Sequence, residues 1–424
     1  MDLTNWNFNF FYGLLYWVSF LAVALVARLF DPSPRGKGLV LGLTSSMMLL
    51  AIPGFGLRDL GLVLALSLLT YALGTVLHRS APMAGAPWRK LVAAAGITAV
   101  LGFLAFFKYG FVQRLFISGP PSAALDAGGF IRLIGVSYFS FRMMHFLVEC
   151  YRNKVEGLDL LAYVNYIIFF PAFISGPINR YNHFASQVRS PARTRPADDL
   201  RAGAERIVHG LFKKLVLAQV LYPHILSSQP DALGRMGPFE VVLGLYAYAL
   251  YFYFDFAGYT DLALGCARLI GIELPENFNN PFLKRNIREL WTSWHMSLTS
   301  WLVDYIYWPI VRKFRSLDYF RRHPVFLSNL GMIITFIACG MWHGESVNFI
   351  LWGAYHGIGI AVLTVYQREK RKARSALLQK YFRSKVSTVV GTFLTFNFFA
   401  FGLSLFVLDL ERLRILAAAL LARL

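Results

Sequence analysis

Long apolar runs separated by short polar segments dominate the chain. A helix that crosses a membrane needs about 20 mostly apolar residues. Seven runs approach that length: Phe8–Val26, Leu60–Leu77, Leu91–Phe107, Phe239–Phe256, Val325–Met341, Phe349–Val365 and Val389–Val407. Leu39–Ile52 is shorter and is expected to insert steeply or only in part. The pattern predicts an all-α protein that crosses a membrane several times.

Five weaker runs are interrupted by polar residues: Phe130–Val148, Leu160–Ile174, Ile207–Leu226, Thr260–Ile272 and Ile287–Trp308. Pro171, Gly176 and Pro177 break up the second of these runs. Irregular backbone at membrane depth requires protein or water around it, so we expect a re-entrant element there. We predict about eleven spanning or re-entrant helices in one membrane-embedded domain over residues 1–424.

Charged residues indicate how the helices are oriented. Lys and Arg gather in four loops: Arg28–Lys37, His78–Lys90, Arg312–Arg322 and Arg368–Lys385. Short basic loops stay in the cytoplasm, which places the N-terminus outside and the turn at His343 toward the outer half. The first run follows an acid, and no small-residue cleavage site comes after it, so we expect a retained helix rather than a signal peptide.

Composition supports a membrane protein and argues against nucleic-acid binding. Hydrophobic residues make up 56% of the chain and charged residues 15%, compared with about 25% charged in soluble domains. The formal charge of +19 is spread over loops between apolar runs, as expected for topology and lipid contact. Cys150, Cys266 and Cys339 lie far apart in or beside apolar runs. Their spacing predicts neither a disulfide framework nor a metal site.

Two histidines in apolar runs are the first candidates for chemistry. His343 follows Val325–Met341, and His295 lies in W-T-S-W-H-M-S-L. An ionisable side chain at membrane depth is costly and therefore indicates function. A neutral imidazole can accept a hydroxyl proton and return it to a leaving group, and an apolar environment favours that neutral form.

Four motifs carry a resemblance to a known family. They are G-V-S-Y-F-S-F-R-M-M-H-F-L-V-E (Gly135–Glu149), F-F-P-A-F-I-S-G-P-I-N-R-Y (Phe169–Tyr181), the segment Tyr253–Leu283 leading into E-L-W-T-S-W-H-M-S-L, and C-G-M-W-H-G-E-S. Together, over about residues 135–357, they resemble the membrane-bound O-acyltransferase (MBOAT) family in its bacterial AlgI/DltB-like branch. The resemblance implies an MBOAT fold with a central funnel or tunnel, in a multi-pass protein of the cell membrane.

The resemblance also implies a reaction and its participants. An acetyl or D-alanyl group would pass from a cytoplasmic thioester to hydroxyls of an extracytoplasmic polymer, either a teichoic-type acid or an exopolysaccharide. The donor would be an acyl carrier protein bearing phosphopantetheine, or acetyl-CoA, with no bound cofactor. A membrane-anchored or periplasmic transferase is a possible partner at the acceptor side. His343 would be the catalytic residue, with His295 as its partner.

Other residues of the motifs are candidate supporting or substrate-binding residues. Trp342 and Trp294 precede the two histidines, and Arg180 follows a Gly-Pro turn. Asn277 and Asn279 lie between Pro275 and Pro281, where their amides could cap broken helices. Asp255 and Asp261 should be paired at membrane depth, and Arg268, Arg285 and Arg288 are the candidate partners.

Several alternatives stay open from the sequence. His343 could merely bond a carbonyl, His295 could brace its helix, and His356 is expected to be structural. Cys339 precedes His343 by four residues, on the same helical face, and could form an acyl-enzyme. The rival functions are a transporter or flippase for a polymer precursor, and a scaffold for a separate acyltransferase. The segment Arg312–Arg322 lacks the glycines of alginate-type relatives; it favours D-alanylation and could dock an acidic carrier protein.

Overall fold

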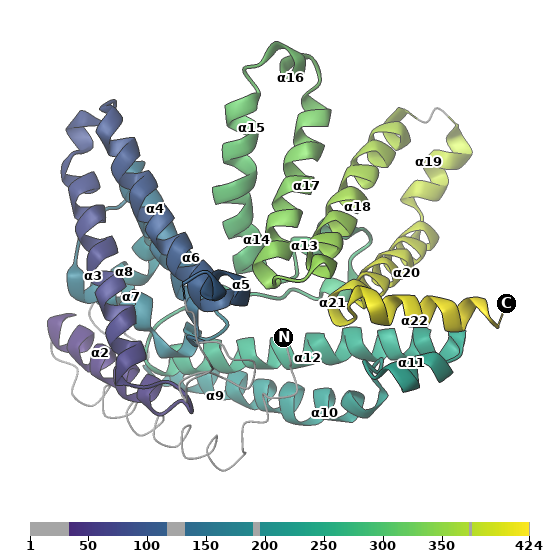
Figure 1. Ribbon diagram of the computed structural model, residues 1–424, viewed down its shortest axis with the longest axis horizontal. Helices are drawn as coiled ribbons and strands as arrows, with labels where there is room; N and C mark the ends of the chain where they lie inside the picture. The colour runs from purple at the N-terminus through teal and green to yellow at the C-terminus, as the bar shows by residue number, and fades with distance from the viewer. Residues whose placement is uncertain (1–33, 117–131, 190–195, 373–374, 424) are drawn as a thin grey trace. The chain divides into compact units, whose positions relative to one another are not determined.

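The computed structural model describes residues 34–116, 132–189, 196–372 and 375–423. All regular elements within these ranges are helices (Figure 1). The chain divides into two compact units, Met1–Val208 with Asp261–Pro275 and His209–Thr260 with Glu276–Leu424. The long helix α12 (Pro238–Leu269) contributes to both units.

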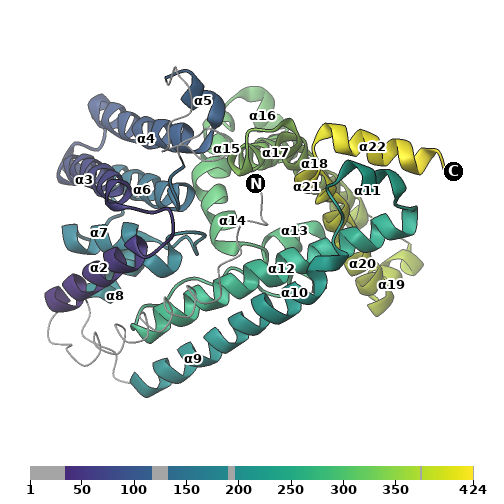
Figure 2. The same ribbon diagram turned by 60° about the horizontal axis from the view of Figure 1, so that its bottom comes forward.

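The first unit contains a group of long helices followed by shorter ones. Its elements are α2 (Pro34–Leu50), α3 (Leu57–Arg79), η2 (Ala81–Met83), α4 (Pro87–Lys108), α5 (Gly110–Arg114), α6 (Val136–Tyr151), α7 (Leu160–Ile168), η3 (Phe170–Ala172), α8 (Tyr181–Arg189) and most of α9 (Pro196–Phe212). Helices α3, α4 and α6 pack together, and α2 lies beside α7 and α8 (Figures 1 and 2).

A buried arginine joins the ends of these long helices. Arg89, only 1% exposed, donates hydrogen bonds to the carbonyls of Leu77 (3.0 Å) and Tyr151 (3.2 Å) and to Asn153 Oδ1 (2.6 Å). Carbonyls at helix C-termini lack intrahelical partners and carry partial negative charge. The basic loop His78–Lys90 therefore fastens α3 and α4 to α6, besides contributing charge for topology.

The interrupted run Leu160–Ile174 forms a short helix and irregular backbone. Helix α7 has nine residues, too few to cross a membrane. The guanidinium of Arg142, on α6, donates to the carbonyls of Tyr166 (2.6 Å) and Ala172 (3.1 Å). Side chains of neighbouring helices thus satisfy backbone groups that the broken helix leaves open, as irregular backbone inside a membrane requires.

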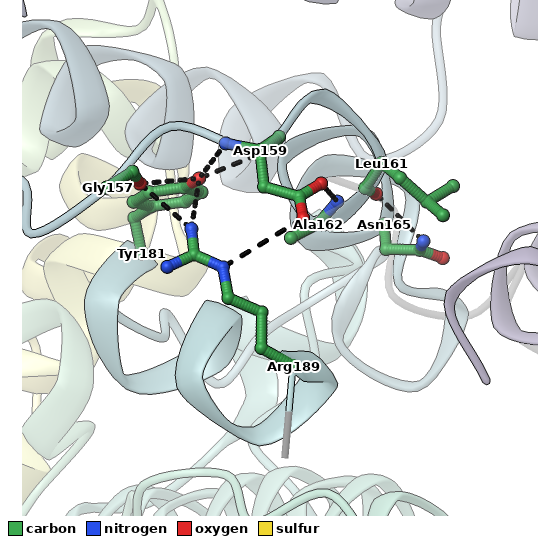
Figure 3. A network of polar contacts seen from close by, with 7 residues as sticks. All are labelled: Gly157, Asp159, Leu161, Ala162, Asn165, Tyr181 and Arg189. Carbon is green, nitrogen blue, oxygen red and sulfur yellow. Dashed lines mark hydrogen bonds and ion pairs between the residues drawn. The ribbon is translucent and has the colours of Figure 1, made fainter. Parts of the chain in front are cut away.

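The start of α7 is fixed by a small polar network (Figure 3). Asp159 caps the helix by accepting a hydrogen bond from Ala162 N at 2.9 Å. The Tyr181 hydroxyl accepts hydrogen bonds from Asp159 N (3.2 Å) and Arg189 Nη2 (3.3 Å). Arg189 also donates to Gly157 O at 2.8 Å. These contacts tie α8 to the loop that precedes α7.

The second unit holds the end of α9, the first part of α12, the elements between them and all elements after α12. They are η4 (Lys213–Leu217), α10 (Ala218–Leu221), η5 (Tyr222–His224), α11 (Pro230–Arg235), η6 (Pro281–Leu283), α13 (Ile287–Trp291), α14 (Met296–Leu302), η7 (Val303–Tyr307), α15 (Trp308–Phe314), α16 (Asp318–Arg322), α17 (Pro324–His343), α18 (Val347–Lys372), α19 (Ala376–Arg383), α20 (Lys385–Gly402), α21 (Ser404–Val407) and α22 (Leu410–Leu421). The C-terminal α22 packs on α11 around an apolar cluster that includes Leu233, Leu245 and Leu416 (Figure 2).

Helices α17 and α18 form a tight antiparallel hairpin (Figure 1). A Cβ at Gly340 would lie 2.1 Å from the carbonyl oxygen of Phe349, and a Cβ at Gly353 would lie 2.3 Å from that of Phe336. Only glycine allows backbones to approach this closely. His343 ends α17 at the turn of the hairpin, whereas the basic residues before α17 and at the end of α18 lie at its other end.

The structure confirms most of the predicted spans. Six described helices are long and apolar enough to cross a membrane, and each contains one of the seven long runs. The remaining run, Phe8–Val26, lies outside the described residues. The runs Phe239–Phe256 and Thr260–Ile272 were wrongly separated, because α12 is continuous from Pro238 to Leu269.

Asp255 and Asp261 are the polar residues that suggested an interruption in α12. They are paired, as expected, but with other cations than the proposed ones. Asp255 pairs with Lys214, and Asp261 pairs with Arg206 at 2.8 Å. Arg268 pairs instead with Asp199, at 2.7 Å. Acids inside a membrane helix are tolerated when a neighbouring helix supplies cations. Here α9 and η4 supply them, so the polar residues do not interrupt α12.

Candidate functional site

One cavity in the second unit contains both candidate histidines. It has a volume of about 220 Å³. Its walls come from α12, α13, α14, α17, α18, α20 and α21, and most of the lining side chains are apolar or aromatic. His295 and His343, 48 positions apart in the sequence, both line it. A largely apolar cavity with a few converging polar groups is the usual form of a small-molecule site.

His295 occupies a break between two short helices. Helix α13 ends at Trp291 and α14 begins at Met296. His295 has φ 43° and ψ 52°, in the left-handed region. That region is unfavourable for residues with a Cβ, although histidine enters it more often than most. Strained backbone of this kind persists where surrounding contacts fix it, and it gathers at functional sites.

Asn277 supplies the contacts that fix this break. Its backbone carbonyl accepts a hydrogen bond from Met296 N at 2.9 Å. Its Oδ1 accepts from Ser297 N (3.3 Å) and from Ser297 Oγ (2.6 Å). The predicted capping of a broken helix by an amide is therefore confirmed for Asn277, which is fully buried.

The same amide oxygen orients the imidazole of His295. Nδ1 of His295 lies 3.3 Å from Asn277 Oδ1. Because an amide oxygen can only accept, Nδ1 carries the proton and the lone pair of the neutral ring resides on Nε2. The side chain of His295 is buried, with 5% of its surface exposed. The ring of His295 thus has a fixed orientation, with Nε2 as its candidate proton acceptor.

His343 is surrounded by aromatic rings at the end of α17. Its ring centroid lies 4.7 Å from that of Trp342, 5.2 Å from Trp352 and 5.0 Å from Phe406. The side chain is half-buried and lines the cavity. Aromatic walls exclude water from such a site and strengthen the interactions made inside it.

The cavity follows one face of α17. Met332, Thr335, Phe336, Cys339 and His343 all line it, at the three- and four-residue spacings of one helix face. From Met332 to His343 this wall is about 16 Å long at 1.5 Å per residue. Gly340 and Gly344 contact Phe349 instead. These two glycines permit close helix packing, and neither lines the cavity.

The other predicted site residues lie in several places. Trp294 lines the cavity, whereas Trp342 does not line it and packs against the ring of His343. Asn279 is exposed, and its backbone N–H donates to Ser293 O at 3.0 Å. Asp255 is engaged with Lys214. Arg180 and Asp261 belong to the first unit, where the Arg180 guanidinium lies 3.5 Å from His145 Nδ1.

The place of Arg288 was missed from the sequence, whereas that of His356 agrees with the expected structural role. Arg288, proposed as an ion-pair partner, instead lines the cavity and donates to Thr364 Oγ1 (2.7 Å) and Gln367 Oε1 (3.1 Å). His356 is fully buried against Trp291 and Trp352 and does not line the cavity. Among the described residues, no group of three or more His, Cys, Asp or Glu side chains could hold a metal ion.

We expect the Asn277→Ala variant to lose catalytic rate while it stays folded. Without the amide, the left-handed turn and the ring of His295 lose their support, and small displacements of a catalytic group reduce rates by roughly tenfold to a hundredfold. The loss is measured in purified membranes as the steady-state rate of the reaction that the motif resemblance implies, acyl transfer. The matched control is Asn279→Ala, whose side chain is exposed and whose contact to Ser293 is made by the backbone, so it should leave the rate unchanged. Equal rates in both variants would contradict this account of Asn277.

Comparison with known proteins identifies the family. Residues 132–407 match the membrane-bound O-acyltransferase (MBOAT) family, a span that includes the cavity and both histidines. This chain therefore belongs to the membrane-bound O-acyltransferases, which are multi-pass membrane enzymes. The family resemblance drawn from the sequence motifs is confirmed.

Individual relatives fall into two groups by name. The chain is 30% identical to a teichoic acid D-alanyltransferase of Bacillus subtilis over 65% of this chain and 69% of the relative. It is 32% identical to a protein of the same name from Streptococcus thermophilus, over 63% and 66%. It is 29% identical to a probable alginate O-acetylase AlgI of Azotobacter vinelandii, over 81% and 66%. The matches thus span about two thirds of each relative, and identity does not separate the two groups.

Proposed function

We propose that the cavity of the second unit is the active site of an O-acyltransferase that modifies a cell-envelope polymer. The observation that carries the proposal is the convergence of His295 and His343 on one apolar cavity. A buried cavity with two imidazoles suits proton transfer between a hydroxyl and a thiol. The family to which the chain belongs supplies the class of reaction.

The proposed reaction is a direct acyl transfer. One imidazole, proposed to be His343, accepts the proton of the acceptor hydroxyl as its oxygen attacks the thioester carbonyl. The carbon–sulfur bond breaks, the ester forms, and the proton passes to the departing thiolate. Nδ1–H of His295 is committed to Asn277, so His295 acts through Nε2, as a second proton acceptor or by orienting the substrates.

The hairpin geometry supports a donor that enters from the basic end. His343 lies at the turn of the hairpin, and Lys370, Arg371 and Lys372 end α18 at the opposite end. Short basic segments mark the cytoplasmic side, so a cytoplasmic thioester would reach the histidines lengthwise along α17. The basic stretch Arg312–Arg322 belongs to the same end and suits docking of an acidic acyl carrier protein.

The acyl group and acceptor are proposed from the relatives' names. D-alanyl transfer to a teichoic-type acid and acetyl transfer to an exopolysaccharide such as alginate both join a small acyl group to a polymer hydroxyl. The volume of about 220 Å³ is below the 300 Å³ or more of typical drug-sized sites and suits a thin arm with a short acyl group. The acceptor, presented directly or by a partner transferase, would meet the donor near His343.

Cys339 allows the cavity to be tested directly. A methanethiosulfonate reagent that adds a bulky group to Cys339 should block acyl transfer from a phosphopantetheine thioester, because this side chain lines the donor path. Modification is confirmed by peptide mass, and transfer is measured as ester formed on the purified polymer. All three cysteines are buried, but Cys150 and Cys266 do not line the cavity, so the reagent can reach Cys339 through the cavity alone.

The control is the Cys339→Ala variant. We expect it to retain transfer and to resist the reagent, which would also exclude an acyl-cysteine intermediate. Full transfer by protein with modified Cys339 would show that the donor does not use this cavity. Loss of transfer in Cys339→Ala without loss of folding would favour covalent catalysis instead.

A further inference from the structure

Arg288 is a cation on the wall of a mostly apolar cavity. It lines the same cavity as His295 and His343. Its guanidinium donates to the neutral oxygens of Thr364 and Gln367, at 2.7 and 3.1 Å. In the described ranges no carboxylate lies within ion-pair distance of it, whereas its neighbour Arg285 pairs with Glu289 at 2.8 Å. Arg288 is thus an exposed guanidinium that is hydrogen-bonded to two neutral side chains of α18 and has no carboxylate partner in the described ranges.

The position of Arg288 along the hairpin is defined by α18. Trp352, whose ring contacts His343 at 5.2 Å, marks one level of the cavity. Thr364, which holds Arg288, lies twelve residues later on the same helix, or about 18 Å at 1.5 Å per residue. Arg288 thus stands at the end of the cavity away from His343, near the basic end of α18.

We propose that Arg288 binds the phosphate of a donor whose thioester lies at His343. This proposal rests on the proposed function and adds a recognition element at the far end of the cavity. A pantetheine arm has about thirteen bonds between its phosphate and its sulfur. At the roughly 1.2 Å per bond of an extended chain, it spans about 16 Å. With a hydrogen bond at the phosphate, this length matches the separation of Arg288 from the level of His343.

The chemistry of the two groups also matches. A guanidinium presents several N–H donors in one plane and binds phosphate with charge-assisted hydrogen bonds. The bonds to Thr364 and Gln367 use part of this donor set and orient the rest. By binding the phosphate, Arg288 would set how far the pantetheine arm extends into the cavity, so that the thioester lies beside His295 and His343.

The test is a binding measurement with two ligands that differ only in phosphate. Purified protein in nanodiscs of zwitterionic lipid is titrated with phosphopantetheine and with pantetheine. We expect the wild type to bind phosphopantetheine about tenfold more tightly, and Arg288→Gln to bind both equally. Pantetheine affinity should be the same in both proteins, which shows that the variant is folded. Arg285→Gln is the matched control and should keep the full preference.

The outcomes separate this inference from the proposed function. A wild type that binds both ligands equally, or a variant that weakens both equally, would overturn the role of Arg288 as a phosphate ligand. If anionic phospholipid in the nanodisc abolishes the preference of the wild type, the guanidinium holds a lipid phosphate and the inference fails. If phosphopantetheine is preferred through Arg288 but its acyl thioester is never consumed, the acyltransferase proposal fails and the phosphate site stands.

Discussion

Replacing His343 by alanine is expected to reduce acyl transfer by a factor of about 10² to 10⁴, the usual contribution of a general base. The side chain is half-buried at the end of α17, and its ring packs against the aromatic rings of Trp342 and Trp352. Its removal should leave the hairpin folded, because Gly340 and Gly353 form the closest backbone contacts. Initial rates with a saturating thioester donor measure the effect.

His356→Ala is a useful comparison for this variant. His356 is a second histidine of the same hairpin, fully buried against aromatic rings, and its loss should lower stability more than the rate per folded molecule. A scaffold for another acyltransferase would tolerate the loss of both His343 and His295. Unchanged transfer by the double variant at equal membrane abundance would therefore contradict the active-site assignment.

Gly340→Ala is expected to destabilise the protein by about 3 kcal/mol or more, at the upper end of overpacking effects. The new Cβ would lie 2.1 Å from the carbonyl oxygen and 2.9 Å from the carbonyl carbon of Phe349. Neither atom can move without displacing the backbone of α18. The hairpin must open, which separates His343 from Trp352 and Phe406. Thermal unfolding in detergent and transfer activity should fall together.

Gly102→Ala controls for the substitution itself. A Cβ at Gly102 would have no neighbour within 4 Å, and the residue lies inside α4. Alanine there should be neutral or should stabilise by roughly 0.5 to 1 kcal/mol through its better helix propensity. If Gly340→Ala unfolds at the same temperature as Gly102→Ala, the two helices do not pack as closely as described.

Hydropathy alone predicted the spanning helices well. The runs Leu60–Leu77 and Leu91–Phe107 lie inside α3 and α4, and each helix extends only a few residues beyond its run. Such runs are informative because a lipid environment requires continuous apolar helix. The motifs also identified the family and both cavity histidines. That the chain forms a single domain stays a prediction.

Long-range contacts account for what the sequence did not show. No glycine or proline marks the break before His295, since the break depends on Asn277, which is 18 positions away. The cations that pair with Asp255 and Asp261 come from α9 and η4 rather than from the following basic residues. Arg288 could not be assigned to the cavity, because its walls come from segments between Phe252 and Phe406.

The most direct test of the central claim is mass spectrometry of the purified envelope polymer. Cells that carry the wild type are compared with cells that carry His343→Ala at matched membrane abundance. We predict that an ester-linked acetyl or D-alanyl group is present in the first polymer and lost from the second, and its mass identifies the acyl group. A polymer with the same ester content in both would contradict catalysis by this cavity and favour a transporter or scaffold.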